Sequence, residues 1–242
     1  MKLRLKKIFR KKQKDPHCSV VVVAAGSSER MGSDKMLMTL EAKPVIIRTL
    51  MAFQKCPMVD DIVVVTKREK IMALADMIKL YDISKVTQVI SGGATRMESS
   101  LAGVSAVRKG AKLIAIHDGA RPLVSQELIE RVVKAANEHI SAVPVVPSTD
   151  TLKQIDKDGI ITGSVDRDSV VRVQTPQVFD ADVIKGALTK AVQKRMPITD
   201  DCSAVDMMGF STYTVAGDAG NIKLTLPEDM VLAEAILKNR GD

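Results

Sequence analysis

Apolar residues along this chain fall into two kinds of segment that alternate. Short continuous runs rich in β-branched residues predict buried strands at residues 20–24, 61–66, 85–90, 112–117 and 142–147. Longer stretches with apolar residues at helical spacing lie between them, at 44–55, 68–80, 96–109 and 126–138. Pro44 and Ser125 mark helix starts, because proline fits the first turn and a serine hydroxyl accepts from an early backbone N–H. The pattern predicts an α/β fold with parallel strands covered on both faces.

The alternation breaks between residues 148 and 175. Two extended segments, 151–155 and 170–174, flank turn chemistry at Asp158-Gly159. Such an arm has too few apolar residues to be stable alone, so we expect it to pack on another subunit. A helix at about 181–194, a polar loop to residues 199–201, a strand near 212–215 and a helix from Pro227 complete the chain. We see no internal repeat, so 18–242 is interpreted as one domain, with 148–175 as a dimerisation arm.

The charge of the chain lies mostly in its first residues. The net charge is +7, but residues 1–17 contain eight Lys and Arg and one Asp, which leaves 28 basic and 28 acidic side chains elsewhere. A neutral body with four Phe, two Tyr and no Trp argues against nucleic-acid binding. The basic leader, residues 1–17, fits either a disordered solubilising segment, which we expect, or an amphipathic helix that touches anionic lipid.

Cysteine usage and hydropathy indicate a cytoplasmic protein. Cys18, Cys56 and Cys202 are far apart and lack metal-ligand spacing, which is typical of a reducing compartment. We see no signal peptide and no apolar run long enough to cross a bilayer. With 242 residues and 45% hydrophobic content, the chain is long enough for one substantial core.

Candidate chemistry follows the predicted strands. Ligands of open parallel sheets bind beyond the carboxyl ends of the strands, which places a site at loops 25–35, 91–96 and 117–122. The first loop holds Gly26, Arg30 and Lys35, a glycine for close backbone approach and two cations for phosphates. It lacks the Walker A ending and the three-glycine dinucleotide pattern. An ordinary turn with solvated charges fits the loop equally well.

The other two loops are also rich in nucleotide-binding groups. Gly92 and Gly93 would let backbone groups face a base edge, although a plain strand-to-helix connection has the same pattern. Asp118, after a buried strand, is a natural Mg²⁺ ligand, and Arg121 could hold a phosphate bidentately. The alternative is a turn-capping aspartate paired with that arginine. His117 is interpreted as a packed side chain, because no other histidine has ligand spacing.

Taken together, the motifs resemble one family. A-A-G-(x)-R-M-(x)-K, S-G-G-(x)-R, H-D-G-A-R-P, D-T-L-K, V-D-R, Q-T-P-Q, I-T-D-D and N-I-K-L-T occur in the order typical of 2-C-methyl-D-erythritol 4-phosphate cytidylyltransferases. The resemblance covers residues 19–237. It implies a Rossmann-like three-layer nucleotidyltransferase fold with a mostly parallel central sheet and a protruding β-arm. It also implies CTP and a phosphorylated polyol as substrates, Mg²⁺ as cofactor, and a homodimer.

The resemblance assigns a role to each matching residue. It implies catalytic roles for Arg30, Lys35 and Lys223, and Mg²⁺ binding by Asp118. Nucleotide contacts fall on Ala24, Ala25, Gly26, Gly93, Ala94 and Ser99. Substrate contacts fall on Arg121, Thr151, Arg167, Thr175 and Thr199, of which Thr151 and Arg167 lie on the arm and would reach the neighbouring subunit's site. Asp200 and Asp201 are candidates for a second carboxylate near the metal.

The chain departs from the family pattern in two places. Asp34 and Met36 flank Lys35 where proline or asparagine and glutamine are common, and Ala94 replaces a residue that is often acidic or polar. A cytidylyltransferase acting on ribitol 5-phosphate is the nearest alternative function. A sugar-1-phosphate nucleotidyltransferase would share only the first loop. A non-enzymatic membrane adaptor is disfavoured because Lys35, Asp118 and Lys223 are all present.

Overall fold

The computed structural model of the chain describes residues 16–26 and 34–241. Its centre is a sheet in the order β10-β7-β11-β6-β1-β4-β5, with β12 paired to β7. The strands are β1 (Cys18–Val23), β4 (Val59–Thr66), β5 (Val86–Ser91), β6 (Leu113–Asp118), β7 (Ser141–Pro147), β10 (Val171–Val173), β11 (Gln177–Asp180) and β12 (Tyr213–Ala216). Strands β6, β1, β4 and β5 are mutually parallel, whereas β11 runs antiparallel between β6 and β7. The mostly parallel α/β sheet predicted from the sequence is confirmed.

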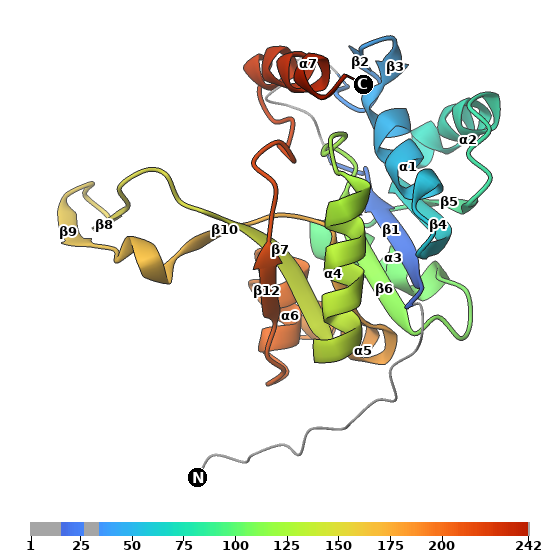
Figure 1. Cartoon of the computed structure of the whole chain (residues 1–242). Coiled ribbons are helices and arrows are strands. Elements are labelled where there is room, and N and C mark those ends of the chain that lie inside the picture. Colours follow the sequence, from blue (N-terminus) through green and yellow to red (C-terminus); the bar gives the residue numbers. More distant parts are fainter. Residues whose placement is uncertain (1–15, 27–33, 242) are drawn as a thin grey trace.

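Helices cover both faces of this sheet (Figure 1). They are α1 (Val45–Lys55), α2 (Ile71–Leu80), preceded by the 3₁₀ turn η2 (Arg68–Lys70), α3 (Arg96–Ala106), α4 (Gln126–His139), α5 (Ala181–Gln193), α6 (Asp201–Asp206) and α7 (Glu228–Arg240). Successive residues of β1 point to opposite faces, so Val20 and Val22 pack in the core under α1, α2 and α4, whereas Val21 packs with α3, α5 and α6. The chain therefore forms three layers.

The predicted helix starts are confirmed in their local chemistry. Pro44 directly precedes α1, and Ser125 Oγ accepts a hydrogen bond from the backbone N–H of Leu128, 3.2 Å away. Several short elements were missed, among them the strand β11 and the helix α6. Neither has a distinctive pattern, because β11 has four residues and α6 has six, too few for a helical period to show.

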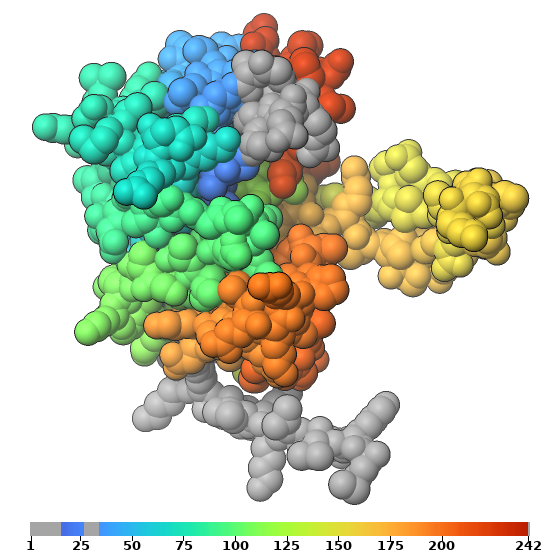
Figure 2. Space-filling model, turned by 180° about the vertical axis from the view of Figure 1, so that it is seen from behind, coloured from blue at the N-terminus to red at the C-terminus, as the bar shows by residue number. Residues whose placement is uncertain are grey.

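Residues between β7 and β10 form an arm that projects from the body. It contains β8 (Lys153–Ile155), β9 (Ile161–Ser164) and η3 (Arg167–Ser169), with β8 and β9 paired in a separate hairpin. Figure 2 shows the arm in yellow, clear of the remaining surface. Ile155, Ile160 and Ile161 at its outer end are each more than 60% exposed.

A small hairpin, β2 (Thr39–Leu40) and β3 (Lys43–Pro44), precedes α1. No helix in the described residues is long and apolar enough to cross a membrane, and the predictions for the leader fall almost entirely outside these residues.

Candidate functional site

A cavity of about 600 Å³ lies at the carboxyl ends of β1, β4, β5 and β6. Eight predicted site residues line it: Ala25, Gly26, Lys35, Gly93, Ala94, Ser99, Asp118 and Lys223. Ala24 is buried in the core at the end of β1. Arg30 lies outside the described residues. The structure thus brings together three loops that are far apart in the sequence, as the strand order predicts.

The glycine loop between β5 and α3 is held by local hydrogen bonds. The Gly93 N–H donates to Ser99 Oγ at 3.2 Å, and the Ser99 hydroxyl donates to the Thr95 carbonyl at 2.9 Å. Thr95 and Glu98 form a capping box at the start of α3. A Cβ on Gly93 would lie 2.4 Å from Cβ of Glu98, so only glycine fits this loop without a shift. The loop can therefore present its backbone to a ligand without intervening side chains.

Three cations surround the carboxylate of Asp118, at the end of β6. Lys223 Nζ lies 2.8 Å from Oδ2, Arg96 Nη2 lies 3.3 Å from Oδ1, and Arg121 Nε lies 3.7 Å from Oδ2. Burial alone would raise the pKa of Asp118, but these cations hold it well below its usual value. Asp118 is therefore ionised throughout the neutral range, and one carboxylate joins side chains from three separate segments.

Arg96 was not assigned a role from the sequence. Its Nη1 lies 2.7 Å from Oδ2 of Asp201, a carboxylate that is 1% exposed at the start of α6. Burial raises the pKa of Asp201, although Arg96 offsets its charge. Asp200 instead caps α6 through the backbone N–H of Ser203. The S-G-G-(x)-R motif could have pointed to Arg96, but its partner Asp201 is remote in the sequence.

A chain of buried hydrogen bonds links the backbone of Asp118 to Thr175 and His117. The Asp118 N–H donates to Thr175 Oγ1 at 3.1 Å, and the Thr175 hydroxyl lies 3.1 Å from Nδ1 of His117. Nε2 of His117 lies 3.1 Å from the carbonyl oxygen of Arg121, which can only accept, so the imidazole carries its proton on Nε2. Burial lowers the pKa of His117 to about 4. His117 is a neutral packed side chain, as the sequence predicted.

The segment that carries Lys223 is fixed to the loop after β6. Arg121 Nη1 donates to the Asn221 carbonyl at 2.8 Å, and the Leu224 N–H donates to the Ala120 carbonyl at 2.9 Å. The Asn221 side chain donates to the carbonyl of Thr175 at 2.9 Å, next to the cis Thr175–Pro176 bond. These bonds place Arg121 and Lys223 on the same side of Asp118.

The remaining predicted residues lie farther from the cavity. Thr199 is next to α6, with Oγ1 3.4 Å from Oγ of Ser203, and does not line the described cavity. Thr151 and Arg167 lie on the arm, where Arg167 Nη2 donates to Thr151 Oγ1 at 3.1 Å. Asp34, an unusual residue for the first loop, pairs with Lys70 of η2 at 2.5 Å.

Asp118, at the cavity wall, is the predicted ligand for Mg²⁺. The described residues contain no group of three or more His, Cys, Asp or Glu side chains able to hold a metal by themselves. Mg²⁺ is commonly held by one or two carboxylates together with substrate phosphates, and Asp118 is an ionised carboxylate at the cavity wall. The donor set fits a metal that arrives with a nucleotide.

A mostly parallel sheet, a glycine loop facing a cavity, and lysine, arginine and aspartate at the cavity wall are typical of nucleotide-binding enzymes of the α/β class. Residues 18–239 match the family model described as 2-C-methyl-D-erythritol 4-phosphate cytidylyltransferase. The chain belongs to this family.

Individual relatives agree with the family match. Curated proteins of that name from Symbiobacterium thermophilum and Dehalococcoides mccartyi are 40% and 41% identical over 225 and 220 residues. These alignments cover 92% and 90% of this chain and 94% and 95% of the relatives. The crystal structure of 4-diphosphocytidyl-2C-methyl-D-erythritol synthase from Anaerococcus prevotii aligns with a TM-score of 0.83 at 28% identity, covering 92% of this chain and 99% of that one. These relatives give no support to the ribitol phosphate alternative.

Proposed function

We propose that this protein transfers the cytidylyl group of CTP to 2-C-methyl-D-erythritol 4-phosphate, releasing pyrophosphate and 4-diphosphocytidyl-2-C-methyl-D-erythritol. The observation that supports this most directly is the cluster of Arg96, Arg121 and Lys223 around Asp118 at the wall of the nucleotide-sized cavity. Two anionic substrates must approach one another in this reaction. A site for it needs more positive than negative charge, held in place before the substrates arrive.

The charges of the cluster meet that need. Asp118 and Asp201 together offset two of the three cations, and Lys35 lines the same cavity. The phosphomonoester of the acceptor is ionised at neutral pH, so its oxygen attacks the α-phosphorus of CTP without a protein base. The bond from the α-phosphorus to the bridging oxygen breaks, and pyrophosphate leaves. Lys35, Lys223 and Arg30 would stabilise the negative charge on the five-coordinate phosphorus.

The nucleotide and metal roles follow from the cavity walls. The backbone of Gly93 and Ala94, with Ser99, would read cytosine, which agrees with alanine at position 94 because its backbone N–H is sufficient. Ala24, Ala25 and Gly26 would line the nucleotide along the end of β1. Asp118 would hold Mg²⁺ together with phosphate oxygens, and the ion would supply charge neutralisation of the triphosphate.

Substrate residues would come from two subunits. Arg121, Thr175 and Thr199 would serve the acceptor phosphate within one chain. Thr151 and Arg167 are hydrogen-bonded to one another on the projecting arm, and they would complete the site of a neighbouring subunit in a homodimer. Exposed apolar side chains on the arm, such as Ile161 and Val171, fit burial against that subunit. The protein would act in the cytoplasm.

The position of bond cleavage tests the proposed reaction. CTP labelled at the α-phosphorus should transfer its label to the polyol product, whereas label at the γ-phosphorus should leave as pyrophosphate. Transfer of the γ-label to the acceptor would make the protein a kinase and overturn the proposal.

Mixing two inactive variants tests the shared site. Arg167→Ala carries a defective arm and an intact cavity, and Lys223→Ala carries the reverse. Co-refolded mixtures should regain activity, because one of the two sites in a mixed dimer is complete. Mixtures as inactive as either parent, despite mixed dimers seen by native mass spectrometry, would show that the arm acts on its own subunit.

A further inference from the structure

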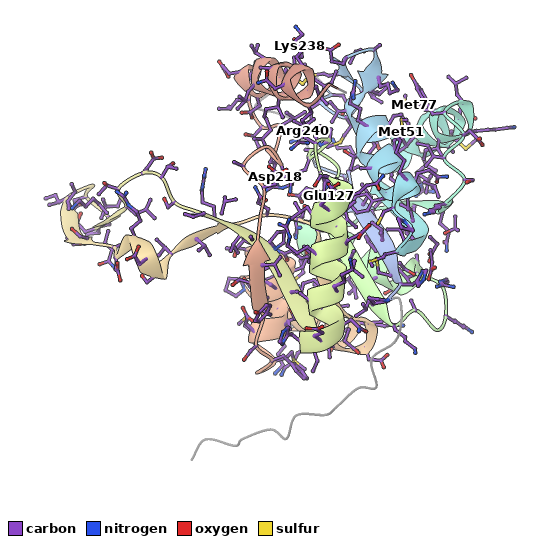
Figure 3. All side chains as sticks on the ribbon, in the orientation of Figure 1. Met51, Met77, Glu127, Asp218, Lys238 and Arg240 are labelled. Atoms are coloured by element: carbon purple, nitrogen blue, oxygen red, sulfur yellow. The ribbon has the colours of Figure 1, made fainter. Side chains whose placement is uncertain are left out.

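Arg240, in the last turn of α7, joins two loops that lead to the site. Its Nη1 donates to the carbonyl oxygen of Leu123 at 2.7 Å, just after the loop that carries Arg121. Its Nη2 lies 2.8 Å from Oδ2 of Asp218, at the start of the segment that carries Lys223. Figure 3 shows Arg240 and Asp218 together below α7. A single planar guanidinium therefore spans two segments that are far apart in sequence.

The contacts continue from Asp218 toward the reacting centre. The other carboxylate oxygen of Asp218 accepts from the Gly220 N–H at 2.7 Å, and its backbone carbonyl accepts from the Gln174 side chain at 2.8 Å. Gln174, which is 6% exposed, precedes Thr175 directly. Arg240 is thus connected to Asp118 through Asp218, Gln174 and Thr175, by hydrogen bonds and the peptide bond between the last two.

The packing around the guanidinium leaves little freedom on the side of Gly220. A Cβ at this position would lie 2.5 Å from Nη2 of Arg240. Leu123, Asp218 and Arg240 also line a separate cavity of about 650 Å³. The side chain of Arg240 is 28% exposed, so its ion pair with Asp218 alone contributes little, and the hydrogen bond to the Leu123 carbonyl is what links the two loops.

We propose that Arg240 is a positioning residue, which fixes the spacing between Arg121 and Lys223 through the Leu123 carbonyl and Asp218. The proposal rests on the proposed function, in which these two cations serve the polyol phosphate and the transferred phosphorus. The glycine loop that would read cytosine belongs to a different part of the cavity wall and has no contact with Arg240. Arg240 should therefore affect the polyol phosphate and leave CTP recognition unchanged.

Steady-state kinetics of Arg240→Met test this separation. We expect kcat/KM for 2-C-methyl-D-erythritol 4-phosphate to fall by about tenfold or more, because small misplacements of reacting groups are costly. The KM for CTP should stay within about twofold of wild type, since the glycine loop that would read cytosine is untouched. Gly220→Ala, which displaces the guanidinium without removing its charge, should give the same pattern. Arg240→Lys, which can hold one of the two acceptors at a time, should recover part of the loss.

Lys238→Met is the matched control, because Lys238 is an exposed cation in the same turn of α7 and lies on its other side (Figure 3). It should behave as wild type. Unchanged kcat/KM for the polyol phosphate in Arg240→Met, or an equal change in both KM values, would overturn the proposal.

Amide hydrogen exchange gives a readout that does not depend on the reaction. Arg240→Met should speed exchange in segments 119–125 and 217–224 while α3 keeps its protection, and Lys238→Met should change neither. Equal protection of both loops in Arg240→Met and wild type would overturn the positioning role. An inactive wild type with loosened loops in Arg240→Met would instead count against the proposed function alone.

Discussion

Arg96→Met perturbs the charge balance of the site most selectively, because methionine keeps the apolar stem and removes the guanidinium. Arg96 bridges Asp201, which is 1% exposed, and Asp118, whose carboxylate is 11% exposed. Removing one partner of a buried ion pair typically costs about 3–5 kcal/mol, because the other charge stays buried without compensation. We expect Arg96→Met to lose about 3 kcal/mol of unfolding free energy at pH 7.5.

The loss should depend on pH in a defined direction. Without Arg96 the pKa of Asp201, already raised by burial, rises further, and Asp118 loses one of its three cations. A carboxyl group with a raised folded pKa destabilises the protein above that pKa and has no such effect once both states are protonated. The difference between Arg96→Met and wild type should therefore be largest near neutral pH and shrink as the pH approaches about 4, the ordinary value for Asp.

Urea unfolding at several pH values measures this difference. Arg68→Met is the control, because Arg68 lines the same cavity but is exposed and has no ion pair to a buried carboxylate among the described residues. The double variant Arg96→Met/Asp201→Asn should regain much of the lost stability, since its buried charge is gone as well. A loss no larger than that of Arg68→Met, or one that is independent of pH, would refute this account of the site.

Three further predictions concern the same centre. Lys223→Ala should lower kcat by roughly 100-fold or more, the scale for losing a preorganised charge donor; near-wild-type turnover would count against its role. Thr175→Val should destabilise the protein by about 1–3 kcal/mol in urea unfolding, because it leaves Nδ1 of His117 and the backbone N–H of Asp118 without their hydrogen-bond partner; a loss within 0.5 kcal/mol, roughly the scale of a neutral surface change, would contradict this. The imidazole of His117 should titrate near pH 4 by NMR. Because the pKa of His117 is lowered in the folded state, the neutral imidazole contributes up to about 3 kcal/mol to the free energy of unfolding above pH 6.5. This contribution is lost as the pH falls toward 4. Titration of His117 at the ordinary pKa of histidine would contradict its burial.

Much of the site could be predicted because the fold brings strand ends together. Asp118 follows a continuous apolar run that ends in a recognisable motif, and parallel strands place that end beside the loops of Gly26 and Gly93. The meeting of Lys223 with Asp118 rested on the family resemblance. No periodicity in the sequence brings residue 223 to the end of β6.

The missed features share a physical cause. The pairing of Arg96 with Asp201 joins residues more than a hundred positions apart, and Asp201 sits in a helix too short to leave a pattern. Strand β11 is four residues long, too short to show a period, and its hydrogen bonds to β6 and β7 join segments that are distant in the sequence. Arg240 is one of many exposed basic residues until the loops of Leu123 and Asp218 are placed around it. Such contacts exist only once distant segments are packed together.

Pyrophosphate release by the purified protein, supplied with CTP, Mg²⁺ and an acceptor, tests the central claim most directly. Parallel reactions should contain 2-C-methyl-D-erythritol 4-phosphate or ribitol 5-phosphate, and UTP or ATP in place of CTP. Release only with CTP and 2-C-methyl-D-erythritol 4-phosphate is the result that the account predicts. Release with ribitol 5-phosphate, or none from a folded dimer, would contradict it.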